Sequence, residues 1–489
     1  MLIPFLSLKE SDYFSYIETP KAIVFVPALL DAFKICREPN CGSYVEKENM
    51  KCKTVGASIS IECLCNNNHF RVWNSSPVVG TGKEAIAVIN ILLATFCLTV
   101  GLHVNQVLDF FAHLRVYCFG KSFYFNLQKR VLEKVVWMQW QLNQKNWLDE
   151  AKKNLKKGIS VSLAGDGKYD SPGFSASYCT YIVQDLYTQA IVGLYVAHKN
   201  QVHSSSEMEP FAVKTLLLNL MHEHKLKIYS ITTDRSSSVK TAISELQSEL
   251  PEGFEAPLHF FDIWHYIKSI LKDLWAACKL KTCKDLIPWI PSITNMLWYS
   301  FSSSIGNLTK LQEMILSIPD HISNVHKFGD NKIHKACEHP DLSSENRTKL
   351  WLFENHLGLK KLRQFIFGRD GSRFKDLQHM LGFTHTGLIE SFNALHNKYA
   401  NKNFFYQPSG MCIRAALAAL DWNCNLKREQ AKSETGKLRF NLVSNRAGSK
   451  WLVLVIVLKI MYTQIIIGLS NPSWKVRIIR GEMLLQSLL

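Results

Sequence analysis

The chain has 489 residues, of which 47% are hydrophobic and 20% charged, a composition that excludes wholesale disorder and predicts several globular domains. Lys and Arg number 57 against 41 Asp and Glu, so the formal net charge is +16. This surplus favours a polyanionic partner, either a nucleic acid or an anionic membrane surface; a basic protein without such a partner is the alternative.

Cysteines gather near the N-terminus, where a segment over residues 1–80 holds five of the 13. Cys36 and Cys41 form a C-x4-C pair, and the later stretch CLCNNNH adds two thiols and an imidazole. Two such pairs suit a tetrahedral zinc ion. We predict a structural zinc ribbon over residues 36–73, with unliganded thiols as the alternative and Cys63 as a competitor for the third position. The predicted ligands are Cys36, Cys41, Cys65 and His69.

Apolar residues at three- and four-residue spacing then predict a helical region over residues 81–158, which is a candidate DNA-binding part of the chain. The apolar run 85–101 is short for a membrane span and contains Asn90, so we expect a buried helix there. No basic signal-peptide start precedes these segments, and we expect reduced thiols in an intracellular protein.

From about residue 159, short apolar or alternating runs indicate strands, and serine-started helices separate the later ones. The strands are expected over 159–166, 175–185, 190–200, 227–234 and 258–265. The resulting order, β-β-β-α-β-α-β-α, is typical of an α/β protein with an RNase H-like mixed sheet, in which the first and fourth strands are neighbours. We assign residues 159–274 to the first part of this core.

The rest of the chain is divided by composition. Residues 275–385 are predicted to form a helical insertion, and residues 386–430 to close the core with two helices. The hydrophobic tail, residues 431–489, is atypical, most clearly from residue 446 onward. A membrane span there is disfavoured because Lys459 lies inside its apolar run. Cys337 and His339 are expected to lie in a surface loop.

Carboxylates are expected where strands of the core end. Asp166 follows the first strand and Asp234 the fourth, so both would lie about 5 Å apart across one strand spacing. Two adjacent carboxylates suit a hard divalent cation such as Mg²⁺ or Mn²⁺, and Glu390 on a later helix would be a third ligand. The alternative roles are a turn residue for Asp166, a helix cap for Asp234 and a solvated helix carboxylate for Glu390. Asp170 is expected to build a turn.

Four stretches of the chain then resemble, in order, the catalytic core of eukaryotic cut-and-paste DDE transposases, with the closest resemblance to the Kolobok-like group. They are GDGKYDSPGFSASYCTYIVQD, ITTDRSSSVK, FFDIWHYIKSILKDL and IESFNALHNKYANK, the last followed by SGMCIRAALAALDWN. The resemblance covers roughly residues 160–425. It implies metal-dependent cleavage and transfer of DNA strands in the nucleus, with transposon ends and target DNA as partners and a homo-oligomer as a further expectation.

Residue by residue, the resemblance implies that Asp166, Asp234 and Glu390 form the catalytic, metal-binding triad. Asp262 and His265 match the family's D-x-x-H motif, with a satisfied histidine at a helix start as the structural alternative. The alternative function is a domesticated or degenerate nuclear DNA-binding protein that lacks catalysis.

Contacts to DNA phosphates are expected from basic stretches, above all the one over residues 360–375. There Arg363, Arg369 and Arg373 alternate with phenylalanines, so that charge can meet phosphate while the rings pack or stack. A solvated helix face is the alternative explanation for any one of these charge runs.

Overall fold

The computed structural model describes residues 16, 19–82, 85–171, 175–339, 349–426, 429–444 and 452–456. The chain divides into two compact units. Unit 1 joins residues 1–145 to residues 394–489, and unit 2 is the continuous stretch 146–393. These two units do not test the segment boundaries predicted from the sequence, which stay predictions. The part of the tail beyond residue 456 lies outside the described residues.

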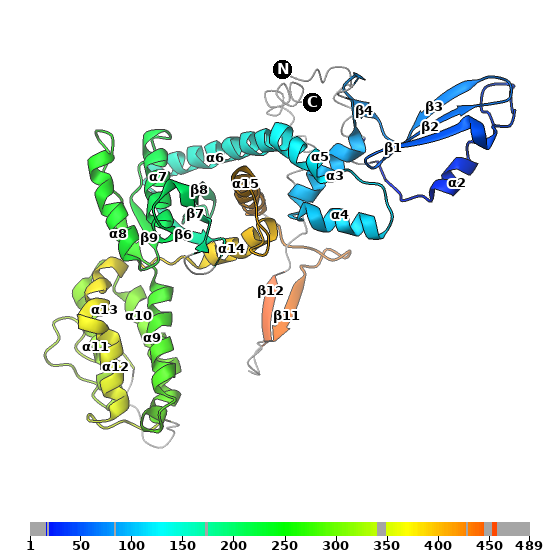
Figure 1. Cartoon of the computed structure of the whole chain (residues 1–489). Coiled ribbons are helices and arrows are strands. Elements are labelled where there is room, and N and C mark those ends of the chain that lie inside the picture. Colours follow the sequence, from blue (N-terminus) through cyan, green and yellow to red (C-terminus); the bar gives the residue numbers. More distant parts are fainter. Residues whose placement is uncertain are drawn as a thin grey trace. The chain divides into compact units, whose positions relative to one another are not determined.

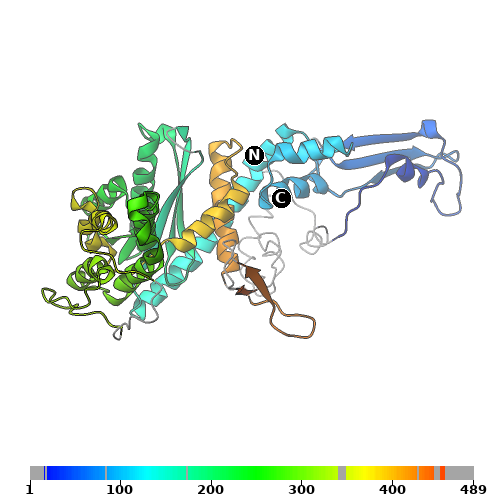
Figure 2. The same ribbon diagram turned by 90° about the horizontal axis from the view of Figure 1, so that it is seen from below.

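Unit 1 contains a three-stranded antiparallel sheet in the order β1-β2-β3, whose strands Figure 2 shows side by side in dark blue. The β1–β2 turn contains Gly56 with a positive φ of 62°, and a Cβ there would lie 2.4 Å from the Asn90 side chain. Asn90 is buried, accepts from the backbone N–H of Ala57 and donates to the carbonyl of Val55. This polar role explains the asparagine in an apolar run.

The strands of unit 1 are β1 (Met50–Val55), β2 (Ser58–Leu64), β3 (Phe70–Asn74), β4 (Val78–Val79), β5 (Ile86–Ala87), β11 (Phe440–Ser444) and β12 (Leu452–Ile456).

The helices of unit 1 after residue 80 agree with the predicted helical regions, whereas α2 was not predicted. The helices of this unit are α2 (Val26–Asp31), α3 (Val88–Thr99), α4 (Val104–His113), α5 (Lys121–Leu127), α15 (Pro408–Asn425) and parts of α6 (Glu133–Lys156) and α14 (Gly387–Tyr399). No helix among the described residues is long and apolar enough to cross a membrane. Arg414 of α15 is buried and donates to the carbonyls of Tyr399 and Leu102, so it joins segments that are distant in sequence.

Unit 2 is built on a mixed five-stranded sheet in the order β10-β9-β6-β7-β8. β9 pairs in parallel with both β6 and β10, while β6, β7 and β8 form an antiparallel meander. The predicted adjacency of the first and fourth strands, β6 and β9, is therefore confirmed. The strands are β6 (Ser162–Tyr169), β7 (Tyr178–Asp185), β8 (Ile191–His198), β9 (Ser230–Thr233) and β10 (Leu258–Phe261).

Helix α7 (Met208–His222) packs on β7 and β8 and against α8 (Ser237–Ser244) (Figure 1). Its buried face consists of Leu, Met, Val and Ala side chains, which explains why it is held to the sheet. The predicted serine cap of this helix is wrong, because α7 begins after Glu207 and no side chain caps it. The predicted serine cap of α8 is confirmed, since the Ser236 hydroxyl accepts from the N–H of Val239.

The stretch after β10 is largely helical, as predicted, and forms a hydrophobic core of its own (Figure 1). Its helices are α9 (Ile263–Ala277), α10 (Ile290–Ser303), α11 (Leu308–Ile322), α12 (Leu357–Phe367) and α13 (Ser372–Lys375), with a 3₁₀ segment at Lys281–Trp289. Leu297, Ile315 and Leu362 are fully buried in this core. The described residues between α11 and α12, 323–339 and 349–356, form no helix, and a short antiparallel pairing joins Lys327 to Ala336.

The strand pairing of β9 and β10 includes a half-buried histidine, His259, that should make unfolding depend on pH. His259 of β10 contacts the Thr233 hydroxyl through Nε2 at 2.8 Å. Burial, with nearby His379 and Lys240, lowers its pKa from 6.5 to about 4. The unfolded state therefore binds more protons between these two values, and the unfolding free energy falls as the pH falls through this range. The effect is at most about 3 kcal/mol.

We expect His259→Gln to make the unfolding free energy of unit 2 less dependent on pH in that range, as measured by urea unfolding followed by tryptophan fluorescence. His113→Gln, at an exposed histidine of α4, is the matched control and should leave the dependence unchanged. Equal pH dependence in both variants and the unchanged protein would contradict this role of His259.

Candidate functional site: an acidic cluster at the sheet

The register of the parallel strands brings Asp166 and Asp234 to equivalent positions. Ala164 of β6 lies opposite Thr232 of β9, and each aspartate follows two residues later. The sequence predicted that Asp166 lies at the end of its strand. Instead, β6 continues to Tyr169 by pairing with β7. The alternative role of Asp166 as a turn residue is therefore wrong. The alternative role of Asp234 as the cap of α8 is wrong too, because Ser236 is the cap.

The Asp166 carboxylate is bound by a residue that the sequence did not single out. Asn393 of α14 donates from Nδ2 to Asp166 Oδ2 over 2.7 Å, and Lys168 donates to the Asn393 carbonyl over 3.1 Å. Burial and the nearby Asp234 carboxylate raise the pKa of Asp166 to about 6, and the Asn393 hydrogen bond only partly opposes this. Asn393 lies one helical turn after Glu390, so α14 contributes to the site at both positions.

His265, in the first turn of α9, lies among three carboxylates. Its Nδ1 is 2.9 Å from Asp234 Oδ1 and 2.9 Å from Asp262 Oδ2, and its Nε2 is 3.6 Å from Glu390 Oε1. The Asp234 and Asp262 carboxylates raise the pKa of His265 to about 10. The imidazole is therefore a cation at neutral pH and offsets the repulsion between the acidic groups.

One oxygen of Asp234 lacks a donor. Although His265 Nδ1 lies 2.9 Å from Asp234 Oδ1, its hydrogen bond goes to Asp262, and the buried Asp234 Oδ1 accepts no hydrogen bond among the described residues. Asp234, Asp262 and His265 have ligand atoms within 4.8 Å of one another and could hold a metal ion. Asp166, Asp234 and Glu390 do not form such a group by themselves. The Glu390 side chain is 47% exposed, and the link from α14 to Asp166 runs through Asn393.

Asp262 is the most heavily hydrogen-bonded member of the cluster, and its side chain has no solvent exposure. As the N-cap of α9 it accepts from the backbone N–H groups of Trp264 and His265. It also accepts from His265 Nδ1 and from both the N–H and the hydroxyl of Thr386. Burial raises the pKa of Asp262, but these hydrogen bonds together lower it by more, so the net shift of the pKa is downward. Asp262 therefore holds the start of α9 to the segment that precedes α14.

A fifth carboxylate, that of Glu209, lies on the other side of β6. A Cβ at Gly167 would lie 2.8 Å from Glu209 Cγ, and one at Gly165 would lie 2.5 Å from the Tyr181 hydroxyl. The two glycines thus make room for Glu209 of α7 and for Tyr181. Burial, with Asp166 and Asp234 nearby, raises the pKa of Glu209 to about 7. Nothing in the sequence around Glu209 indicated this position, because its approach depends on how α7 packs.

The turn predicted for Asp170 is confirmed by its hydrogen bonds. Asp170 Oδ1 accepts from the N–H groups of Ser177 and Tyr178, each over 3.0 Å, at the start of β7. The two aspartates of the GDGKYD stretch consequently differ in role. Asp166 faces the acidic cluster, and Asp170 fixes the path of the chain.

In unit 1, the four predicted zinc ligands meet. Their ligand atoms all lie within 4.8 Å of one another, and the group could hold a zinc ion. Cys41 Sγ is 3.9 Å from Cys65 Sγ and 3.2 Å from His69 Nδ1, and Cys36 Sγ is 3.8 Å from the same nitrogen. A tetrahedral zinc ion with bond lengths of about 2.3 Å to sulfur and 2.0–2.1 Å to nitrogen separates its ligand atoms by about 3.3–3.8 Å.

Each half of this cluster is shaped by a residue with positive φ, Asn40 in the first and Asn68 in the second. The backbone N–H of Cys65 donates to the His69 carbonyl and that of Cys41 to the Glu38 carbonyl. The competitor Cys63 is directed elsewhere, because its thiol donates to the Arg71 carbonyl at 3.7 Å. The structure thus favours Cys65 over Cys63.

The predicted DNA-contacting arginines differ in how they are held. Arg363 pairs with Asp320 at 2.7 Å. Arg373 pairs with Asp273 at 2.7 Å and donates to the Phe365 carbonyl. Arg369 is exposed at a turn, next to Asp370 with its positive φ of 55°. DNA binding by these residues stays a prediction, and Arg369 is the most accessible of the three.

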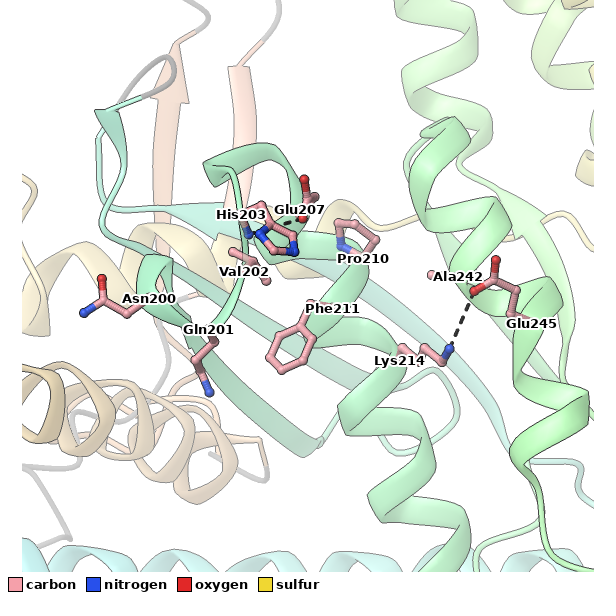
Figure 3. Close-up of a pocket in the computed structure, with 10 residues that line it drawn as sticks. All are labelled: Asn200, Gln201, Val202, His203, Glu207, Pro210, Phe211, Lys214, Ala242 and Glu245. Atoms are coloured by element: carbon pink, nitrogen blue, oxygen red, sulfur yellow. Dashed lines mark hydrogen bonds and ion pairs between the residues drawn. The ribbon is translucent and has the colours of Figure 1, made fainter.

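An open groove of about 470 Å³ lies apart from the acidic cluster, between the loop after β8, α7 and the end of α8 (Figure 3). None of its lining residues belongs to the cluster. Lys214, its cation, is paired with Glu245 at 3.5 Å and with Glu249 at 2.6 Å. The groove therefore offers no unpaired lysine for an anionic ligand.

Comparisons of the chain with protein-family models, with curated proteins and with solved structures found no match. The case for a function consequently depends on the residues and on the geometry of the two clusters.

The hydrogen bonds of Asp262 predict an unusually costly substitution. We expect Asp262→Ala to lower the unfolding free energy of unit 2 by about 2–4 kcal/mol, because it removes a helix cap and leaves buried donors of α9 and Thr386 unsatisfied. Ser236→Ala, which removes an N-cap with one hydrogen bond, should cost about 1 kcal/mol. Urea unfolding measures both losses, and equal losses would refute the proposed tie between α9 and α14.

Proposed function

We propose that this chain is a DDE transposase-like protein, with an RNase H-like core that cleaves and joins DNA phosphodiesters. The observation that carries the proposal is the equivalent placement of Asp166 and Asp234 on adjacent parallel strands. Numbered along the chain, the strands of the sheet follow the order 3-2-1-4-5, which supports an RNase H-like core. The position of Glu390 next to His265 supports its inclusion in the site.

Two observations support the proposal of divalent cations at the acidic cluster. The buried Asp234 Oδ1 accepts no hydrogen bond among the described residues, although His265 Nδ1 lies 2.9 Å away. Burial, and secondly the nearby Asp234 carboxylate, raise the pKa of Asp166. Both features favour a bound cation that adds positive charge beside the carboxylates. Asp166, Asp234 and Glu390 would hold Mg²⁺ or Mn²⁺, hard cations that prefer carboxylate oxygens. Their ligand atoms do not form a metal-binding group without the ion, so they would have to move closer together when it binds. When bound, such ions activate an attacking water or hydroxyl and stabilise the leaving oxygen of a phosphodiester.

The other residues of the cluster would position these ligands. Asp262 fixes Thr386 ahead of α14, and thereby the helix that carries Glu390 and Asn393. Asn393 orients the Asp166 carboxylate by donating to one of its oxygens. His265, as an imidazolium, neutralises part of the negative charge between Asp234 and Glu390. These roles give the D-x-x-H pair a structural function and a charge-balancing function.

DNA is the proposed partner because of the net charge of +16 and the exposed Arg369. The structural zinc site at Cys36, Cys41, Cys65 and His69 would hold together the segment before β1 and the β2–β3 connection. A nuclear location and assembly into homo-oligomers complete the proposal, since both follow from the resemblance to cut-and-paste transposases.

The activity can be tested on supercoiled plasmid DNA with Mg²⁺ or Mn²⁺. We expect metal-dependent nicking that Asp166→Asn or Glu390→Gln lowers by at least about 100-fold, because a lost ligand removes several kcal/mol of charge stabilisation. Affinity for DNA, measured by gel shift without metal, should change little. Glu245→Gln, at an exposed carboxylate of the open groove, is the matched control and should nick normally.

Equal nicking by Asp166→Asn and the unchanged protein would overturn the catalytic proposal. Tight DNA binding by the unchanged protein, without nicking in either metal, would instead favour a non-catalytic descendant of a transposase.

The basic segment yields a second test. Arg369→Ala should reduce the slope of log affinity for DNA against log salt by about one, as expected when one phosphate contact is lost. Arg373→Ala should mainly lower stability, because its guanidinium holds Asp273 and the Phe365 carbonyl. Fluorescence anisotropy at several salt concentrations measures the slope. An unchanged slope in Arg369→Ala would exclude a phosphate contact by this residue.

A further inference from the structure

Three histidines and a cysteine converge in the helical part of unit 2, far in sequence from the acidic residues. Their ligand atoms all lie within 4.8 Å of one another. His321 is in the last turn of α11, which Figure 1 shows beside α12. The other three belong to the non-helical chain that follows. The four residues are His321, His326, Cys337 and His339.

The three imidazoles are arranged like ligands around a common centre. Their ring centroids are 4.9–5.2 Å apart in each pair, and the ring planes cross at 78–87°. His321 Nδ1 lies 3.4 Å from Cys337 Sγ. A tetrahedral zinc ion would place a nitrogen and a sulfur ligand about 3.5 Å apart, given its bond lengths of about 2.0–2.1 Å and 2.3 Å. Mutually perpendicular rings leave room for one ion between them, whereas stacked rings would not.

The backbone holds these ligands in place without help from the four side chains. The N–H of Cys337 donates to the His326 carbonyl, and the N–H of Phe328 donates to the Lys335 carbonyl, so the two segments form a short hairpin. Glu313 of α11 accepts from three consecutive N–H groups at the hairpin turn, at 2.7–2.8 Å. The hairpin is thereby fastened to the helix that carries His321. The expectation that Cys337 lies in a plain surface loop misses this pairing.

Tryptophans border the cluster on the side of the helical core. Trp351 is edge-on to both His321, at 5.8 Å, and His326, at 5.3 Å. Trp289 contacts His321 at 5.9 Å and stacks on Trp351. Such an apolar shell limits water around a metal and strengthens its bonds to the ligands. His339, by contrast, is exposed, which leaves a path for an ion to enter.

We propose that His321, His326, Cys337 and His339 bind a second structural zinc ion, which joins the hairpin over residues 326–337 to the end of α11. Three imidazoles and one thiolate are ligands that zinc accepts, and four protein ligands leave no open position for catalysis. The spacing, His-x4-His followed by Cys-x-His, differs from the C-x4-C and C-x3-H pairs of unit 1. This site does not depend on the proposed activity, because it contains none of the acidic residues.

The zinc content of the full chain tests the proposal. Protein purified after expression with zinc and dialysed against zinc-free buffer should contain two zinc ions per chain, by mass spectrometry of the metal. Cys337→Ser/His339→Asn should retain one. Cys36→Ser/Cys41→Ser should also retain one. Cys52→Ser/His113→Asn removes the same kinds of side chain from exposed positions outside both clusters, and it should retain two.

Replacement of zinc by cobalt shows which cluster holds the metal in a variant that retains only the second cluster, His321, His326, Cys337 and His339. In Cys36→Ser/Cys41→Ser, bound Co²⁺ should give the absorption of a tetrahedral site with weak sulfur-to-metal charge transfer, since this cluster has one thiolate and the cluster of unit 1 has three. One zinc ion in the unchanged protein, lost entirely in Cys36→Ser/Cys41→Ser, would overturn the proposal. So would two zinc ions in Cys337→Ser/His339→Asn.

Discussion

The arrangement of unit 2 depends on one buried carboxylate. Asp262 receives hydrogen bonds from the first turn of α9 and from Thr386, which is 124 positions later in the sequence. A buried carboxylate is stable only when its lone pairs are satisfied, and here backbone and side-chain donors satisfy it. Because the same residue caps α9 and precedes His265 by one turn, the cap, the histidine and the approach of α14 are coupled to one another.

Charge balance explains the composition of the acidic cluster. The register of β6 and β9 places Asp166 and Asp234 together. Burial, and secondly the neighbouring carboxylates, raise the pKa values of Asp166 and Glu209. Carboxylates gathered at neighbouring strands repel one another, and nearby positive charge relieves that repulsion. His265 supplies such charge within the chain, 2.9 Å from an Asp234 oxygen that accepts no hydrogen bond from the described residues.

The sequence allowed prediction of features that follow from local patterns. Strand order, the β6–β9 adjacency and the grouping of Cys36, Cys41, Cys65 and His69 all came from periodicity and ligand spacing. Features created by packing between distant segments were missed. Glu209 reaches β6 only because Gly167 has no side chain there, and the His321 cluster combines a helix end with a hairpin. The end of β6 was placed too early because the antiparallel pairing with β7 continues after the parallel pairing with β9 stops.

The bond between Asp262 and Thr386 has a topological consequence. The chain leaves the core at α9 and returns at α14 through points that are in hydrogen-bond contact, so everything between them is a closed excursion. The entropy of closing such an excursion grows slowly with its length, by only about 0.6 kcal/mol for each doubling. The helical part can therefore lengthen, shrink or be exchanged during evolution while the two ends, and the carboxylates beside them, stay where they are. It is a natural place for a module with its own core and its own ligands.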